Sequence, residues 1–193
     1  MDRPTFIKIL ASDSRDYSNR PLLVNSVIKN KSWILILLHN INDIENNNSS
    51  FSARILELSC KKELGLLLPY LDEFVAIIPK LKLDASIRAS AKIIELLTIK
   101  YFLQKADIYR NSLTNSHLEL FTENCFDWMI NKKAIAIQAH SMYALYLMGK
   151  IYDWVHPELI TMIERNLPKG SAGYKNRGKK VINAIKTNIT FKL

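Results

Sequence analysis

The chain has 193 residues, of which 48% are hydrophobic and 23% are charged, and its formal net charge is +9. This composition is that of a globular domain and excludes an intrinsically disordered chain. A chain of this length fits one domain, which can bury about 70% of its unfolded surface and needs no disulfide or metal to fold.

The N-terminal region shows no signal for export or membrane insertion. Residues 1–10 (MDRPTFIKIL) lack a charged segment followed by a long apolar stretch, so we expect no signal peptide. The run WILILL at 33–38 is too short to span a bilayer, which requires about 20 residues. Cys60 and Cys125 have no metal-like spacing and fit a reducing compartment. We therefore expect a cytoplasmic protein that does not contact a membrane.

The rest of the chain predicts helices in a regular order. It contains only 5 glycines and 6 prolines, too few for a turn-rich β fold. Two short N-terminal helices are expected within 3–30, near 3–11 and 15–30. Helix pairs are expected at about 31–60, 64–103, 116–152 and 157–190, all within one domain spanning 1–193. Polar stretches at 42–50 and 110–116 are expected to be loops.

The helix expected at 85–103 has the clearest periodicity. Its apolar residues recur at helical spacing, at Ile87, Ala91, Ile94, Leu97 and Tyr101. Asp84 is expected to cap this helix, because an aspartate side chain at the N-cap can accept a hydrogen bond from a free backbone N–H. Upstream, Pro69 must lie in a first turn or cause a kink.

A short motif recurs between two of the expected helices. Residues 52–58 read SARILEL and residues 90–96 read SAKIIEL, 38 positions apart. Ala53 and Ala91 are equivalent in the two copies, and weaker matches place Ser141 and Lys179 at the same position of later helices. Small residues there let a partner helix approach closely, so each pair would bury the same face against its neighbour. The predicted fold is an all-α, HEAT/ARM-like right-handed α–α superhelix of about four helix pairs.

Residues 68–97 (LPYLDEFVAIIPKLKLDASIRASAKIIELL) carry this resemblance most fully. This segment resembles a HEAT repeat. Its first helix has an early proline, a short acidic turn follows, and an arginine with small residues begins the second helix. HEAT repeats have a period of about 40–47 residues, which the observed spacings bracket. The HEAT-like glycosylases of DNA alkylation repair offer a fold-level analogy, but their catalytic aspartate and aromatic residues cannot be placed here.

A second resemblance covers most of the chain. LPYLDEF (68–74), CFDWMI (125–130), DWVHPEL (153–159) and GSAGYKNRGKKV (170–181) resemble a family of small bacterial helical proteins, of about this length, often labelled adenylosuccinate lyase. The label implies β-elimination of fumarate by a serine in a loop of the type GSSxMPxKxNP. Gly170, Ser171 and Lys175 follow that loop loosely, but the second serine, the Met-Pro and the Asn-Pro are missing, so Ser171 receives no catalytic role.

No catalytic, cofactor-binding or metal-binding set emerges from the remaining residues. Cys125 lies between Glu123 and Asp127, and acidic neighbours oppose formation of a thiolate. Asp72 and Glu73 are adjacent, so on a helix they point about 100° apart and do not face one site. The histidines match no metal-ligand spacing, and we expect structural or surface roles for them: His39, His117, His140 and His156.

Aromatic residues gather around the third and fourth helix pairs, at Phe126, Trp128, Tyr152 and Trp154. We expect them to pack in the core. If exposed together, they would instead form an anchor for a partner.

The C-terminal segment carries most of the excess positive charge. No acidic residue follows Glu164, whereas eight lysines and arginines do, so the first 164 residues carry only about +1. On a helical wheel, an apolar side contains Tyr174, Val181, Ile182, Ile185 and Ile189. The opposite side is basic, and the candidate residues for binding a partner or polyanion are Lys175, Arg177, Lys179, Lys180 and Lys186. This helix is either a solubilising cap or an electrostatic docking surface.

These observations favour a non-catalytic helical-repeat scaffold or adaptor that binds an unidentified macromolecular partner, most simply a protein. Nucleic-acid binding through the basic C-terminal helix is the alternative, and lyase-like activity is a third that rests on the family label alone. No cofactor is expected.

Overall fold

The computed structural model describes residues 1–12, 17–43, 48–131 and 133–189. Over these residues the chain is helical and contains no strand, which confirms the predicted all-α class. The α-helices are α1 (Arg3–Ala11), α2 (Arg20–Lys29), α3 (Ile34–Asn42), α4 (Ser49–Lys62), α5 (Leu71–Ile77), α6 (Asp84–Thr98), α7 (Asp107–Ser112), α8 (Asn115–Ile130), α9 (Ile135–Met148), α10 (Val155–Asn166) and α11 (Ala172–Thr187).

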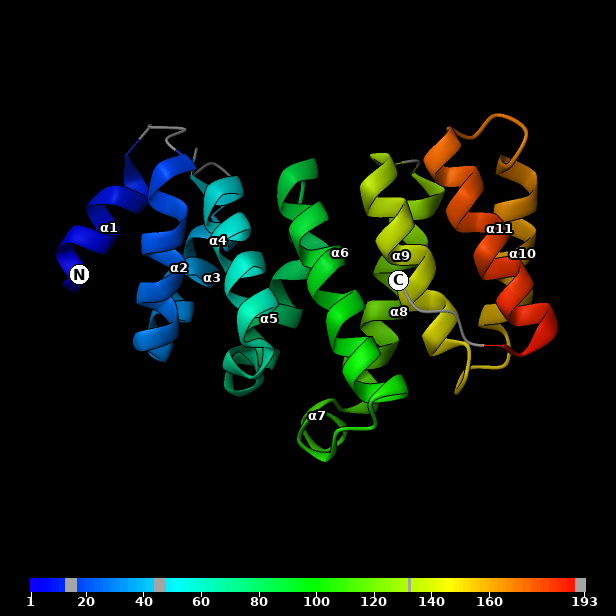
Figure 1. Cartoon of the computed structure of the whole chain (residues 1–193), viewed down its shortest axis with the longest axis horizontal. Coiled ribbons are helices and arrows are strands. Elements are labelled where there is room, and N and C mark those ends of the chain that lie inside the picture. The colour runs from blue at the N-terminus through cyan, green and yellow to red at the C-terminus, as the bar shows by residue number, and fades with distance from the viewer. Residues whose placement is uncertain (13–16, 44–47, 132, 190–193) are drawn as a thin grey trace.

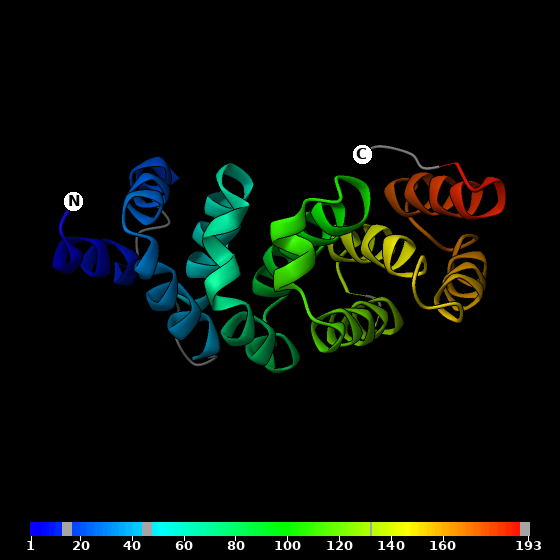
Figure 2. The same cartoon turned by 90° about the horizontal axis from the view of Figure 1, so that it is seen from below.

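The helices follow one another in chain order along the long axis of the molecule (Figure 1). They form two layers (Figure 2): α3, α5, α8 and α10 make the first layer, and α2, α4, α6, α9 and α11 make the second. Neighbours pack within the second layer, α2 on α4, α4 on α6, α6 on α9 and α9 on α11. Helices also pack across the layers, α3 on α4, α8 on α9 and α10 on α11. The second layer therefore presents a continuous face built from helices far apart in the sequence.

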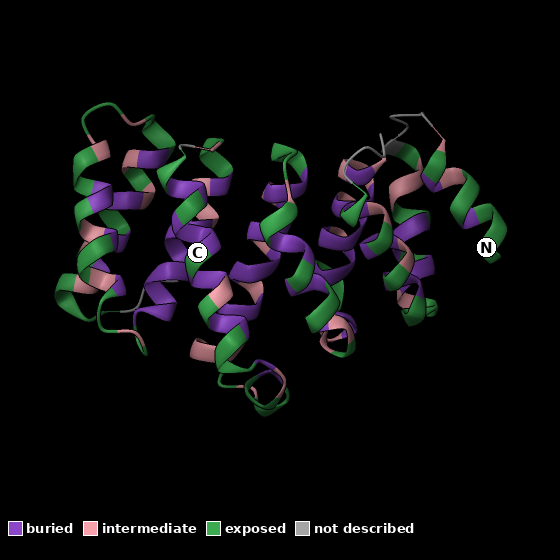
Figure 3. Ribbon diagram, turned by 180° about the vertical axis from the view of Figure 1, so that it is seen from behind, coloured by how far each residue is buried: buried purple, intermediate pink, exposed green. Residues whose placement is uncertain are grey.

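A hydrophobic core runs through the whole array between the layers. Figure 3 shows the buried residues on the sides of the helices that face their neighbours. Ala53 and Ala91, the equivalent small residues of the repeated motif, are both buried, and their helices α4 and α6 pack on each other. In α9, every residue from Ser141 to Met148 is buried, because α6, α8, α10 and α11 all contact this helix.

Of the apolar stripe expected at 85–103, Ile87, Ala91, Ile94 and Leu97 are buried in α6, whereas Tyr101 lies beyond this helix and is partly exposed. The ends of the helix also differ from the expectation. Leu83, not Asp84, occupies the N-cap position, and no side chain caps the helix. Asp84 is instead the first helical residue, and its carboxylate pairs with Lys133 at 3.3 Å. A negative charge there still suits the positive end of the helix dipole. After Thr98 the backbone widens into a π-helical turn over Ile99–Leu103.

Three further segments differ locally from the sequence reading. The short helix α7 begins before, and extends into, the stretch 110–116 that was expected to be a loop. Pro69 lies in a 3-10 segment, Leu64–Tyr70, directly before α5. Helix α11 ends at Thr187, so Ile189 lies beyond the helix and is exposed rather than part of its apolar side. Part of the loop expected at 42–50 lies outside the described residues.

Among the helices of the described residues, none is both long enough and apolar enough to cross a membrane.

Candidate functional site

The two layers carry opposite charge. The second-layer helices contain twelve lysines and arginines but only three acidic residues. The first-layer helices contain seven acidic residues and one arginine. Since the layers form opposite faces of the array (Figure 2), the molecule is electrostatically polarised across its thickness.

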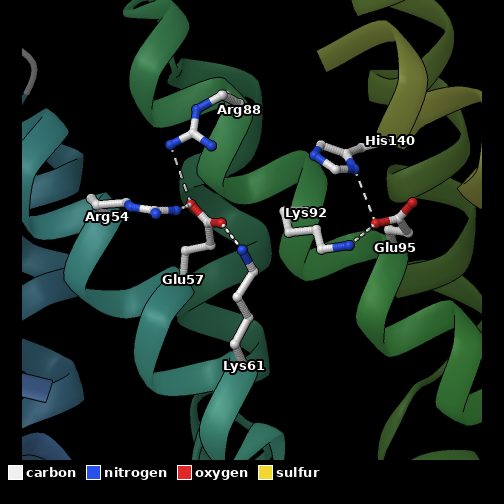
Figure 4. Close-up of polar contacts among 7 residues, drawn as sticks. All are labelled: Arg54, Glu57, Lys61, Arg88, Lys92, Glu95 and His140. Carbon is white, nitrogen blue, oxygen red and sulfur yellow. Dashed lines mark hydrogen bonds and ion pairs between the residues drawn. The ribbon is translucent and has the colours of Figure 1, made fainter. Parts of the chain in front are cut away.

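The first cluster of charges on the second layer surrounds Glu57 of α4. This side chain is fully buried, yet it pairs with Nη1 of Arg54 at 2.6 Å and with Nζ of Lys61 at 2.7 Å. Arg88 of the neighbouring helix α6 adds a third contact at 3.4 Å (Figure 4). Three cations therefore surround one carboxylate, which leaves the cluster positively charged.

The second cluster surrounds Glu95 of α6, which is also fully buried. Lys92 pairs with one carboxylate oxygen, and Nδ1 of His140 on α9 lies 3.0 Å from the same oxygen (Figure 4). Nη1 of Arg177 on α11 lies 4.0 Å from the other oxygen, and its guanidinium lies over the ring of Tyr143 at 5.9 Å. One carboxylate thus connects three successive second-layer helices.

The two clusters arise from the repeated heptapeptide. Glu57 and Glu95 are equivalent residues of the two copies, and each has a basic residue three positions earlier, Arg54 or Lys92. Positions three apart lie on the same side of a helix, which explains the pairing within each helix. Each glutamate is also contacted by a basic side chain from the next second-layer helix, Arg88 of α6 or His140 of α9. Apolar burial alone was expected to explain the repeat, but the repeated basic-x-x-Glu spacing also predicts the ion pair within each helix.

Both carboxylates are stabilised in their charged form. Burial by itself would raise the pKa of Glu57, but hydrogen bonds from Lys61 and Arg54 outweigh burial, and the pKa lies below its ordinary value. For Glu95, burial again favours a higher pKa, but the contacts with His140 and Lys92 outweigh it, so the pKa lies below the ordinary value. Both glutamates are therefore ionised at neutral pH and hold their cations in place.

The five basic residues predicted to form a binding surface on the C-terminal helix differ in exposure and in their partners. Lys179 and Lys180 are exposed, and neither has an ion-pair partner among the described residues. Lys186 is exposed but lies 3.3 Å from Glu164 of α10. Arg177 turns toward Glu95, and Lys175 is half-buried. The helix thus contributes both to the Glu95 cluster and to a free basic edge.

Of the histidines and cysteines considered for catalysis, His117, His156 and both cysteines contact other groups of the fold or are buried in it. Nε2 of His117 lies 2.7 Å from Oδ1 of Asp72, and the other ring nitrogen accepts from the backbone N–H of Thr114 in the capping box of α8. His156 lies 2.9 Å from the carbonyl oxygen of Tyr146. Burial raises the pKa of both thiols, Cys60 and Cys125, to about 12. The described residues contain no group of three or more His, Cys, Asp or Glu side chains that could hold a metal ion.

Ser171, the serine of the lyase-like loop, is the N-cap of α11. Its hydroxyl oxygen accepts a hydrogen bond from the backbone N–H of Tyr174 at 3.2 Å. This contact explains the serine by helix capping, and the resemblance to the lyase loop stays a prediction.

Comparison with known proteins adds no relative: no family model, curated protein or solved structure matches the chain. The geometry alone defines the molecule as an all-helical, two-layered array with a basic face supported by two buried glutamates.

Proposed function

We propose that this chain is a HEAT-like helical-repeat scaffold, a right-handed superhelix of about four helix pairs, that binds an acidic segment of a protein partner on its second-layer face. The serial packing of α2, α4, α6, α9 and α11 supports the repeat architecture, since each of these helices packs on the next one in the row. The related motifs in α4 and α6 support it further. The role is that of an adaptor, without chemistry of its own.

The observation that carries the proposal is the excess of cations in the two glutamate clusters. Each glutamate is contacted by three basic side chains, so one internal negative charge does not neutralise them. These side chains are already restrained and remain partly exposed. When these side chains bind an external carboxylate, they therefore lose less conformational entropy than mobile, unpaired lysines would.

The test uses a short, acetylated and fluorescently labelled oligoglutamate peptide, with binding followed by fluorescence anisotropy. The double variant Lys61→Gln/Arg88→Gln removes two partly exposed charges of the Glu57 cluster. If each contact contributes the ~0.2–1 kcal/mol of an exposed pair, binding weakens about two- to thirtyfold.

The matched control is Arg165→Gln/Lys169→Gln, which removes the same charge from exposed positions outside the second-layer helices. We expect the control to bind within a factor of about two of the wild-type chain, because salt screens charges beyond a Debye length of about 8 Å. An equal loss in both variants would show non-specific attraction to a basic protein and would contradict the proposal.

Nucleic-acid binding is the second candidate, and the exposed Lys179 and Lys180 favour it. Phosphate contacts release counterions, so retention on a polyanion column must fall steeply as salt rises. The slope should become shallower when Lys175, Lys179 and Lys186 are changed to glutamine. A shallow slope that the triple variant leaves unchanged would exclude this candidate and leave the acidic protein segment as the partner.

A further inference from the structure

A pocket of about 280 Å³ lies against α8, a first-layer helix. It is lined by Glu119, Thr122 and Glu123 of α8 and by Tyr152 and Trp154, which lie between α9 and the start of α10. Its lining, as far as the structure describes the chain, contains two aromatic rings and two carboxylates but no lysine or arginine. The pocket therefore differs in kind from the glutamate clusters, where carboxylates are buried under an excess of cations.

Trp154 gives the pocket an exposed aromatic wall. Its ring stacks on Phe126 with centroids 5.4 Å apart and an interplanar angle of 24°. Phe126 is only 8% exposed, whereas Trp154 is 53% exposed. The stack fixes the indole from one side while much of the tryptophan stays open to solvent. All four aromatic residues of this group were expected in the core, but only Phe126 and Trp128 are buried, while Tyr152 is partly buried and Trp154 is exposed.

The two carboxylates of the pocket are not paired with a cation from the described part of the chain. Glu119 and Glu123 are four residues apart on α8, so they lie on one side of the helix, and both are exposed. Neither forms an ion pair with any residue that the structure describes. Like charges at this spacing repel each other, so a bound cation would relieve an unfavourable pair.

The other two lining residues restrict what can enter. Thr122 is buried, and its hydroxyl already donates to the carbonyl oxygen of Leu118 at 2.7 Å. The hydroxyl of Tyr152 donates to the carbonyl oxygen of Asn115 at 3.4 Å. Since both hydroxyl protons are engaged inside the protein, the pocket offers a ligand aromatic surface and negative charge, but few hydrogen-bond donors.

We propose that this pocket binds the guanidinium group of an arginine side chain from a partner polypeptide. A guanidinium is planar and weakly hydrated, so it can stack on the indole while its N–H groups donate to the two carboxylates. An anion would meet two negative charges and no cationic side chain among the lining residues described, and an apolar ligand would leave the carboxylates unpaired. The molecule would thus recognise acidic groups on one layer and a basic group on the other.

The experiment is an NMR titration of the 15N-labelled chain with the probe acetyl-Gly-Arg-Gly-amide. The indole N–H of Trp154, assigned with Trp154→Phe, is the reporter, and the buried Trp33 and Trp128 serve as internal references. We expect a saturable shift at Trp154 alone. The variant Glu119→Gln/Glu123→Gln should raise the dissociation constant at least fivefold.

The control variant Glu73→Gln/Glu158→Gln removes the same charge from exposed first-layer positions outside the pocket. It should bind the probe within a factor of two of the wild-type chain. Three results would overturn the proposal: no saturable shift at Trp154, an equal loss in the control variant, or equally tight binding of acetyl-Gly-Lys-Gly-amide. None of them bears on the second-layer face, which is tested with an acidic probe.

Discussion

Replacing Glu95 with glutamine should destabilise the fold more than most single substitutions. The carboxylate is fully buried and is contacted by basic side chains from α6, α9 and α11. Glutamine has nearly the same shape, so the change removes the negative charge without creating a cavity. Lys92 and Arg177 then lie beside His140 without a counter-charge. Breaking a buried ion pair by removing one partner costs about 3–5 kcal/mol.

The exposure of the cations sets the size of the effect. The basic side chains around Glu95 are 19–23% exposed, whereas the basic side chains around Glu57 are 26–39% exposed. More exposed cations are hydrated more easily once their partner is lost. We therefore expect Glu95→Gln to cost about 3 kcal/mol, at the low end of the range for buried pairs. The better-hydrated cluster around Glu57 should lose about 2 kcal/mol in Glu57→Gln, within the range for hydrogen bonds to charged groups.

The assay is equilibrium unfolding in urea, followed by circular dichroism at a helical wavelength. A shift of the midpoint at constant slope reports a change in stability rather than in the surface exposed on unfolding. A loss below about 1 kcal/mol for Glu95→Gln, typical of exposed pairs, would refute the reasoning. A greater loss for Glu57→Gln than for Glu95→Gln would refute it as well.

The same variants should respond differently to acid. The pKa of both glutamates is lower in the folded chain than the ordinary value of 4.5. Their contribution is therefore fully present above about pH 4.5 and is lost as the pH falls through the lower folded values. The wild-type chain should lose stability more steeply below pH 4.5 than Glu57→Gln/Glu95→Gln does. Parallel pH curves for the two proteins would contradict this.

Two further outcomes follow from the packing. Cys60 and Cys125 are buried with raised pKa values, so a thiol reagent at neutral pH should label them only after unfolding in urea, and rapid labelling of the native chain would contradict their burial. At Gly178, an added Cβ would lie 2.6 Å from a methyl group of the buried Ile163, so Gly178→Ala should cost about 1–3 kcal/mol by overpacking. At Gly173, an added Cβ would lie 3.4 Å from the nearest side-chain atom, so Gly173→Ala should stabilise the chain by up to about 1 kcal/mol through helix propensity. Thermal unfolding of the two variants checks this difference. Equal shifts of the melting temperature would show that α10 and α11 are not closely packed.

Periodicity and small residues were sufficient to predict the all-α class and the apolar stripe of α6. Helical spacing puts Ile87, Ile94 and Leu97 on one side, and these residues are buried. The exact helix ends could not be obtained in this way. Asp84 is a good N-cap by type, but it pairs with Lys133, which is distant in the sequence, and the helix begins one residue earlier than expected.

The candidate sites depend on contacts between residues that are distant in the chain. Reading the C-terminal charges alone identified Arg177 as a surface residue, whereas the fold turns it toward Glu95, 82 positions earlier. The pairing of Arg88 with Glu57 also depends on how α4 and α6 pack. Trp154 and Phe126 come together only because α8 lies beside the turn before α10. Local sequence patterns contain no information on these long-range contacts. The repeated basic-x-x-Glu spacing predicts only the pairs within one helix, Arg54 with Glu57 and Lys92 with Glu95.

The most direct test of the account is an NMR map of where an acidic partner binds. The 15N-labelled chain would be titrated with the acetylated oligoglutamate peptide, and shifts would be plotted along the sequence. We predict that the shifts concentrate on the second-layer helices, beside Lys61, Arg88, Lys92 and His140, and that α5, α8 and α10 stay unchanged. Shifts centred on the first layer, or spread evenly over both layers, would contradict the claim that the buried glutamates support an acid-binding face.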